Sequence, residues 1–314
     1  MTDLRRWAPS LTAFAKWLSI QSESAAKMWS RRLNSEHAYH VEGAVAEAVV
    51  WDFVMCRCDS ARLTDTGGTG GVDFEFVNNG QSFLVEVTNI STDAASEASG
   101  MPDKELFNGF YSLLTEKIRS KVRGKFKQVQ RQRQQQNHPL LVFVTTLHWN
   151  VSSVCIDYRA IEYAMGSPPK ITGNYNSATG KVEGDLYQWT DLDRSVFLSP
   201  KLILSPDGTP IAQAKFQPIS GFLLGGFGLN PREVPVLGGL NPEATFHFDP
   251  TILPDIPFCS LHPWPASERI GLKWTITEEQ MHRQKQAAAE HRLRVSGHGD
   301  LLDSIRDTID REID

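Results

Sequence analysis

The chain has 314 residues, of which 40% are hydrophobic and 22% are charged, and its formal net charge is −5. These proportions are typical of globular proteins and exclude a disordered, collagen-like or disulfide-stapled chain. The acidic balance also excludes a protein that coats nucleic acid through bulk positive charge. No apolar run approaches the roughly 20 residues that span a bilayer, and the N-terminal sequence does not resemble a secretory signal. We therefore expect a cytoplasmic protein that has no membrane partner.

Helices are predicted in the first part of the chain. Apolar residues recur at spacings of three and four in residues 3–33, and a second such pattern covers residues 37–54. The helical spacing of apolar residues ends after residue 54. Residues 60–65 are short and mixed, and residues 66–71 read TGGTGG, a composition typical of turns.

A β-hairpin is predicted next, from two alternating runs at 72–77 and 83–87 that flank Asn79-Gly80. A turn at this dipeptide sets Asp73 almost opposite Glu86. Cross-strand neighbours lie roughly 4.5–5.5 Å apart at Cβ, and two carboxylates at that separation repel unless a cation lies between them. Mg²⁺ prefers such oxygen ligands. Glu75 shares the face of Asp73, but we expect it to be structural.

The elements that follow indicate an α/β protein. We expect a polar loop after the hairpin, a helix from about 103 to 135, and a buried strand at 140–146, which reads LLVFVTT. The order helix, strand, hairpin, helix, strand predicts a mixed central sheet flanked by helices. Residues 151–275 are expected to be rich in strands and loops, with a buried strand at 219–226. Two further helices are expected at 276–294 and 299–313.

One segment is strongly basic. Residues 115–133 contain eight lysines and arginines and one acid, which gives this segment +7 and leaves the rest of the chain at −12. Such local polarisation is typical of a surface that holds a polyanion. The plain alternative is a solvated helix face.

The acidic residues resemble the motif of the PD-(D/E)XK, or restriction-endonuclease-like, nuclease superfamily. That motif consists of an acid on a first helix, an aspartate after a Gly-rich turn, and Glu-x-Lys on the next strand. The matching residues here are Glu47 (or Glu42), Gly70-Gly71-Val72-Asp73 and Glu86-Val87-Thr88. The matching segment covers residues 36–146, and its order of elements resembles the α-β-β-β-α-β core of the superfamily.

The chain departs from that motif at Thr88, which stands where the superfamily has lysine. Threonine has no charge with which to orient a water molecule or stabilise a developing anion. Some members carry this lysine on the next helix. Lys117, Lys121 and Lys125 are four residues apart and share one helix face. Among them we assign the catalytic role to Lys121 or Lys117.

The resemblance implies a Mg²⁺-dependent nuclease, with Mn²⁺ as a substitute, that hydrolyses phosphodiester bonds, and DNA is the expected substrate. Bacterial defence or restriction is the setting that it suggests. Asp73 and Glu86 would be both catalytic and metal-binding. Glu47 and Glu42 are the further metal-ligand candidates. The candidates for nucleic-acid contacts are Lys121, Lys125, Gln128, Arg119 and Arg123.

Three regions are expected: a helical N-terminal extension (1–35), a nuclease-like domain (36–275) and a helical C-terminal tail (276–314). The domain divides into a motif core (36–146) and a strand-rich elaboration (147–275). The N-terminal helices or the tail are the expected contacts of a homodimer or a partner protein.

Two alternatives remain open. The first is a catalytically inactive nucleic-acid-binding or scaffold protein on the same fold, which Thr88 favours. The second is an unrelated α/β protein whose acidic pair binds a metal or a small phosphate ester. This second alternative predicts that the lysines of 117–133 point away from Asp73 and Glu86.

Overall fold

The structure is a computed structural model that describes residues 4–64, 72–99, 111–132, 137–155, 157–166, 172–176, 179, 181–187, 195–199, 203–208, 210–228, 235–262, 264, 271–284 and 286. Its helical elements are η1 (Leu4–Trp7), α1 (Ala8–Gln21), α2 (Glu23–Leu33), α3 (Ala38–Met55), α4 (Thr92–Ser99), α5 (Tyr111–Gln132), α6 (Trp149–Cys155), α7 (Tyr158–Met165) and η3 (Pro250–Ile252). Its strands are β1 (Ser60–Leu63), β2 (Phe74–Asn78), β3 (Gln81–Ile90), β4 (Leu140–Thr146), β5 (Thr172–Asn176), β6 (Lys181–Tyr187), β7 (Ile203–Leu204), β8 (Pro210–Ile211), β9 (Gly221–Gly226), β10 (Leu237–Leu240), β11 (Phe258–His262) and β12 (Gly271–Trp274).

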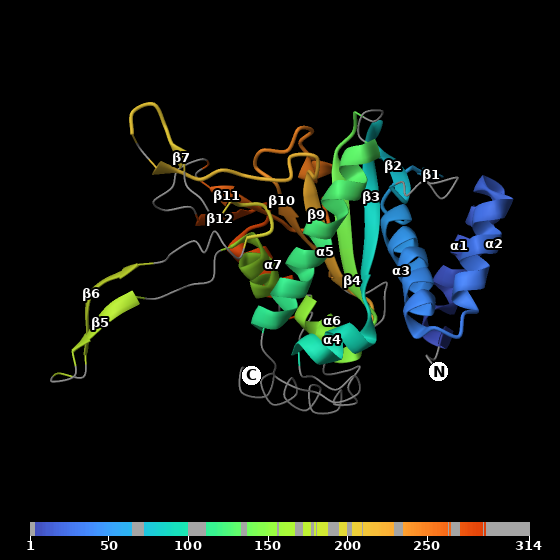
Figure 1. Cartoon of the computed structure of the whole chain (residues 1–314), viewed down its shortest axis with the longest axis horizontal. Coiled ribbons are helices and arrows are strands. Elements are labelled where there is room, and N and C mark those ends of the chain that lie inside the picture. The colour runs from blue at the N-terminus through green and yellow to red at the C-terminus, as the bar shows by residue number, and fades with distance from the viewer. Residues whose placement is uncertain are drawn as a thin grey trace, which may run out of the picture.

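An eight-stranded mixed sheet forms the centre of the protein, in the order β1-β2-β3-β4-β9-β10-β11-β12 (Figure 1). Strands β1, β2 and β3 form an antiparallel meander. The pairs β3–β4 and β4–β9 are parallel. The remaining neighbours are antiparallel except β10–β11. The predicted α/β class with a mixed central sheet is therefore confirmed.

Helices cover both faces of this sheet (Figure 1). Alternate residues of β3 divide between the two faces. Phe83 and Val85 join the hydrophobic core under α1, α2 and α3, whereas Leu84 joins the core that includes Ile118 and Val122 of α5. Because Glu86 lies two residues after Leu84 on the same strand, its side chain lies on the same face of the sheet, the one that α5 covers.

The predicted hairpin is confirmed, including its register. Phe74 pairs with Val85 and Asn78 with Gln81, which is the pairing expected for a turn at Asn79-Gly80. Asn79 (φ 51°) and Gly80 (φ 74°) both have positive φ. A two-residue turn of this kind favours Asn-Gly because its twist matches that of the strands. The strand expected at 140–146 is also confirmed, as the fully buried β4.

The helical pattern expected at 3–33 is confirmed as η1, α1 and α2, with a break at Ser22, whose extended backbone and side chain cap α2. Other expectations need correction. The polar loop expected after the hairpin contains helix α4 instead. The segment after residue 150, expected to consist of strands and loops, also contains most of α6 and all of α7. In the expected C-terminal tail, residues 278–284 are helical, and the helix expected at 299–313 lies outside the described residues.

Candidate active site

Two of the predicted acids meet at the open end of the β2–β3 hairpin. Asp73 directly precedes β2, and the register of the hairpin continues to place it opposite Glu86 of β3. Oδ2 of Asp73 accepts a hydrogen bond from the backbone N–H of Val87 at 2.7 Å. This bond ties the aspartate to the strand that carries Glu86. The side chain of Glu86 is only 2% exposed, so its carboxylate sits in a largely desolvated place.

A lysine of helix α5 contacts one of these two acids. Nζ of Lys125 donates to Oε1 of Glu86 at 2.5 Å. Lys125 lies on α5, the helix that covers the Glu86 face of the sheet. Thr88 lies on the same face of β3 and carries no charge. Lys125 therefore brings a cation to the carboxylates from a helix, although the strand position that could have supplied it holds threonine.

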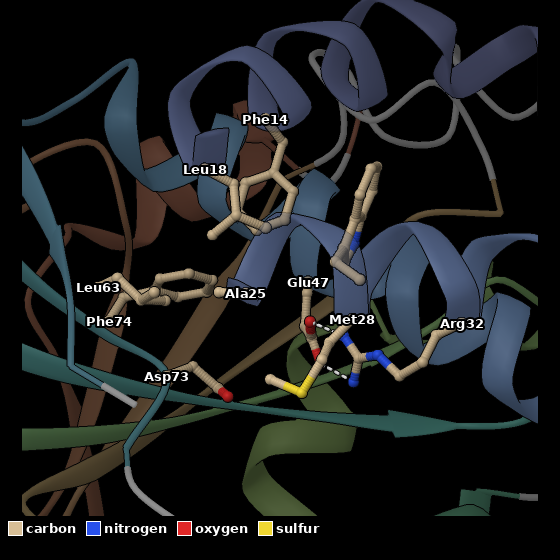
Figure 2. Close-up of a pocket in the computed structure, with 10 residues that line it drawn as sticks. Phe14, Leu18, Ala25, Met28, Arg32, Glu47, Leu63, Asp73 and Phe74 are labelled. Carbon is tan, nitrogen blue, oxygen red and sulfur yellow. Dashed lines mark hydrogen bonds and ion pairs between the residues drawn. The ribbon is translucent and has the colours of Figure 1, made fainter. Parts of the chain in front are cut away.

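A third carboxylate approaches from the other face of the sheet. Glu47 of α3 forms a two-pronged ion pair with Arg32 of α2, in which Nη1 of Arg32 lies 2.8 Å from Oε1 of Glu47. Asp73, Glu47 and Arg32 line the same cavity, where the dashed lines of Figure 2 mark the ion pair. Three acids from three separate elements thus converge, and each of the two glutamates is matched by one cation.

The electrostatics show how closely these groups interact. The pKa of Asp73 is raised well above its ordinary value, first by desolvation and then by repulsion from Glu86 and Glu47. Desolvation also raises the pKa of Glu86, against the pull of Lys125. The pKa of Lys125 is raised because attraction to Glu86, Asp73 and Glu47 outweighs its own desolvation, the largest single cause. Burial and the two neighbouring carboxylates therefore favour the protonated form of Asp73.

Glu42 and Glu75 have other partners. Oε2 of Glu42 accepts from the backbone N–H of Thr92 at 2.8 Å and from Nδ2 of Asn89 at 3.3 Å. Glu42 thereby satisfies a backbone donor at the start of α4. Glu75 pairs with Arg62 of β1. Of the two helix glutamates considered for the metal, Glu47 is the one that the structure brings to Asp73.

The other α5 residues that were predicted to act in catalysis or to contact nucleic acid have different surroundings. Lys117 and Lys121, the predicted catalytic candidates, precede Lys125 on the helix. Burial, together with repulsion from Lys125 and Lys117, lowers the pKa of Lys121. Arg119 pairs with Glu116. Arg123 is used inside the protein, because Nη2 donates to the carbonyl oxygen of Ser195 at 2.5 Å. The side chain of Gln128 lies outside the described residues.

Sequence reasoning missed two roles. Lys125 was assigned to nucleic-acid contacts, yet it is the lysine that reaches Glu86. Its spacing of four from Lys121 could not reveal which turn of α5 stands over β3, because that depends on packing. Arg32 was not considered at all. Its only signal was a basic residue on a helix predicted to precede the acidic helix.

The donor set suits a hard divalent cation. Among the residues that the structure describes, no three His, Cys, Asp or Glu side chains are grouped closely enough to hold a metal, since Glu47 turns to Arg32 and Glu86 to Lys125. Asp73 and Glu86 nevertheless offer carboxylate oxygens at neighbouring positions of the hairpin, and desolvation is the first cause that raises the pKa of each. Mg²⁺ or Mn²⁺ prefers such ligands.

Comparison with models of known families, with curated proteins and with solved structures finds no match for this chain. Within the described part of the chain, none of the helices has the length and apolar character needed to cross a membrane.

Proposed function

We propose that this chain is a Mg²⁺-dependent nuclease that hydrolyses phosphodiester bonds of DNA, built on a restriction-endonuclease-like core. One observation carries the proposal: Asp73, Glu86 and Lys125, from a hairpin and the helix that covers it, meet at one end of the sheet. The order α3, β1, β2, β3, α4, α5, β4 supports it, because, apart from the short additional helix α4, it follows the α-β-β-β-α-β core of the superfamily that the motif resembles.

In this proposal each residue has a distinct task. Asp73 and Glu86 would hold a divalent cation, which would supply Lewis-acid activation of water and neutralise phosphate charge. The ammonium of Lys125 orients the attacking water and stabilises the charge that develops on the phosphate. The water oxygen forms a bond to phosphorus while the bond from phosphorus to the leaving oxygen breaks; the water releases its proton to solvent, and the leaving oxygen takes a proton from solvent. Glu47 would be a further ligand of the cation if its ion pair with Arg32 opened.

The position of Lys125 weighs against one alternative. An unrelated protein with an acidic pair for a small phosphate ester would have the lysines of α5 pointing away from that pair. Lys125 instead contacts Glu86, and the negative charge of Asp73 also raises the pKa of Lys125. The basic face of α5 that continues from Lys125 through Lys121 to Lys117 could follow further phosphates of a polyanion.

A catalytically inactive binding protein on the same fold is the second candidate. The observation that favours it is that Glu47 and Glu86 already have cationic partners, Arg32 and Lys125. In such a protein the ion pairs would hold the fold together and would not exchange with a metal. The two candidates differ in whether Mn²⁺ binds at Asp73.

The deciding experiment measures cleavage of supercoiled plasmid and of single-stranded DNA with Mg²⁺ or Mn²⁺, together with Mn²⁺ binding by calorimetry. Asp73→Asn and Glu86→Gln are expected to abolish both. Glu75→Gln is the matched control, because it removes a carboxylate from the same hairpin that pairs with Arg62 instead. DNA binding without Mn²⁺ binding or cleavage in the wild type would favour the inactive protein.

A further inference from the structure

A cavity of about 200 Å³ opens beside the carboxylates, between the N-terminal helices and the sheet (Figure 2). Helices α1 and α2 form one side, α3 contributes Glu47, and the ends of β1 and β2 form the other. The lining residues are Phe14, Leu18, Ala25, Met28, Trp29, Arg32, Glu47, Leu63, Asp73 and Phe74.

The two ends of the cavity differ in chemistry. Arg32, Glu47 and Asp73 form a charged end, and the other lining residues are apolar. Three aromatic rings belong to the apolar part, with the ring of Phe14 5.2 Å from that of Trp29 and 5.9 Å from that of Phe74. Met28 is half exposed and lies close to the Glu47–Arg32 pair in Figure 2.

The size and lining limit what could enter. Pockets for drug-sized ligands measure roughly 300–1,000 Å³, so this smaller cavity suits a single planar ring system. The apolar walls favour an uncharged ring, and the charged end lies where the proposed function puts a phosphodiester. A nucleobase joined through its sugar to that phosphate has both properties. In a duplex the bases are stacked and paired, so a base in the cavity must have left the stack.

We propose that this cavity binds one unstacked nucleobase of the nucleic-acid substrate, next to the phosphodiester at Asp73, and so directs the protein to single-stranded or locally unpaired sites. The inference rests on the proposed nuclease function and specifies its substrate class. Phe14, Trp29 and Phe74 are themselves nearly buried, so the cavity offers apolar walls rather than an open stacking platform. Such walls suit a base of any sequence because every base has a π-face. The planar guanidinium of Arg32 at the charged end adds donors and a stacking surface.

Photo-crosslinking tests this proposal without relying on cleavage. Oligonucleotides carrying 5-iodo-deoxyuridine are bound with Ca²⁺ in place of Mg²⁺, as a single strand and as a matched duplex, and crosslinked peptides are identified by mass spectrometry. We expect crosslinks from the single strand to peptides of α1 and α2 that contain Phe14 or Trp29. The duplex should give few such crosslinks.

Two variants close the cavity without touching its charged residues. Ala25→Phe fills it from α2, and Met28→Phe narrows it from a half-exposed position that folding tolerates. Each should lower the crosslinking yield by about tenfold, within the range expected for losing one stacked base. Ser24→Phe, at an exposed position of the same helix, is the matched control and should crosslink like the wild type.

The possible results distinguish a failure of the base-binding cavity from a failure of the proposed nuclease function. Crosslinks confined to α5, or yields that Ala25→Phe and Met28→Phe leave unchanged, would overturn the base-binding cavity, whereas metal-dependent cleavage lost in Asp73→Asn would still uphold the nuclease. Equal crosslinking of single strand and duplex would also overturn it. A wild-type protein that neither binds Mn²⁺ nor cleaves DNA would overturn both proposals.

Discussion

Nζ of Lys125 lies 2.5 Å from Oε1 of Glu86, so a lysine on a helix contacts the carboxylate of a strand that carries the uncharged Thr88 two residues further on. If this ammonium acts in hydrolysis, Lys125→Ala should lower kcat by about 10²–10³-fold, as removal of one charge-stabilising donor does in other enzymes. Steady-state cleavage assays measure this, with DNA affinity followed separately.

Lys121→Ala is the matched control, one turn along the same helix face. Its effect on kcat should stay within about threefold, because burial and the neighbouring lysines, rather than a carboxylate, dominate its surroundings. A larger loss of kcat in Lys121→Ala than in Lys125→Ala would mean that the site rearranges when substrate binds and that Lys121 is the acting lysine.

Asp73→Asn should stabilise the metal-free protein at neutral pH. Desolvation and repulsion from Glu86 and Glu47 raise the pKa of Asp73. The folded state therefore favours the protonated form of Asp73. Its contribution to the free energy of unfolding is fully present below the ordinary pKa of 3.8. This contribution is lost as the pH rises through the higher pKa that Asp73 has in the folded protein. A neutral asparagine avoids that loss, and we expect a gain of about 1–3 kcal/mol at pH 8.

Urea unfolding in EDTA at pH 4 and pH 8 measures this effect, which should grow with pH. Saturating Mg²⁺ should reverse the order, because the cation stabilises only the protein that binds it. Glu75→Gln, which removes a carboxylate already paired with Arg62, should give no gain. A wild-type protein more stable than Asp73→Asn at pH 8 in EDTA would contradict the prediction.

Arg32 should compete with the divalent cation for Glu47. Arg32→Met is expected to raise the affinity for Mn²⁺ by about two- to fivefold, because a partly exposed ion pair is worth up to about 1 kcal/mol. Calorimetric titration of the nucleic-acid-free protein measures the change. Lys27→Met, which removes an exposed cation of the same helix that pairs with Glu23, is the control. Weaker Mn²⁺ binding in Arg32→Met would show that Arg32 positions Glu47 instead of competing for it.

Arg123 and Lys121 should differ in what they affect. Arg123 donates to the carbonyl oxygens of Ser195 at 2.5 Å and Val196 at 3.2 Å. Arg123→Met should therefore lower the free energy of unfolding by about 1–2 kcal/mol and leave the salt dependence of DNA binding unchanged. Lys121→Met should reduce the slope of log affinity against log salt by about one. Fluorescence anisotropy at several salt concentrations and urea unfolding measure the two effects. The reverse assignment would place Arg123 on the DNA.

The parts of the fold predicted correctly depend on neighbours in sequence. Asn79-Gly80 fixes the hairpin and hence the register that brings Asp73 to Glu86, and the unbroken apolar run at 140–146 predicts β4. Helix α7 was also readable, since Asp157 caps its start and Gly166 ends it in the left-handed region, but this signal was overlooked.

Other features depend on distant packing. The backbone N–H at the start of α4 is satisfied by Glu42, fifty residues earlier in the chain. The turn of α5 that stands over Glu86, and the placement of Arg32 beside Glu47, also follow from how α5 and α2 pack against the rest of the protein. Periodicity predicts a helix and its apolar face, but it does not say how far that helix slides along a sheet, so Lys125 could not be distinguished from Lys121 by spacing.

The delivery of the lysine by a helix has an evolutionary consequence. A lysine on a strand has one position from which it can reach its carboxylate, because its neighbours point to the opposite face. On α5 the lysines recur at 117, 121 and 125, about 6 Å apart along the axis. If the helix shifted by one turn, or if residue 125 were substituted and the helix repacked, a neighbouring lysine of α5 could contact Glu86 in place of Lys125. Descendants of this chain could therefore keep the charge pattern of the site while its lysine moves in the sequence, and a motif that demands Glu-x-Lys would overlook them.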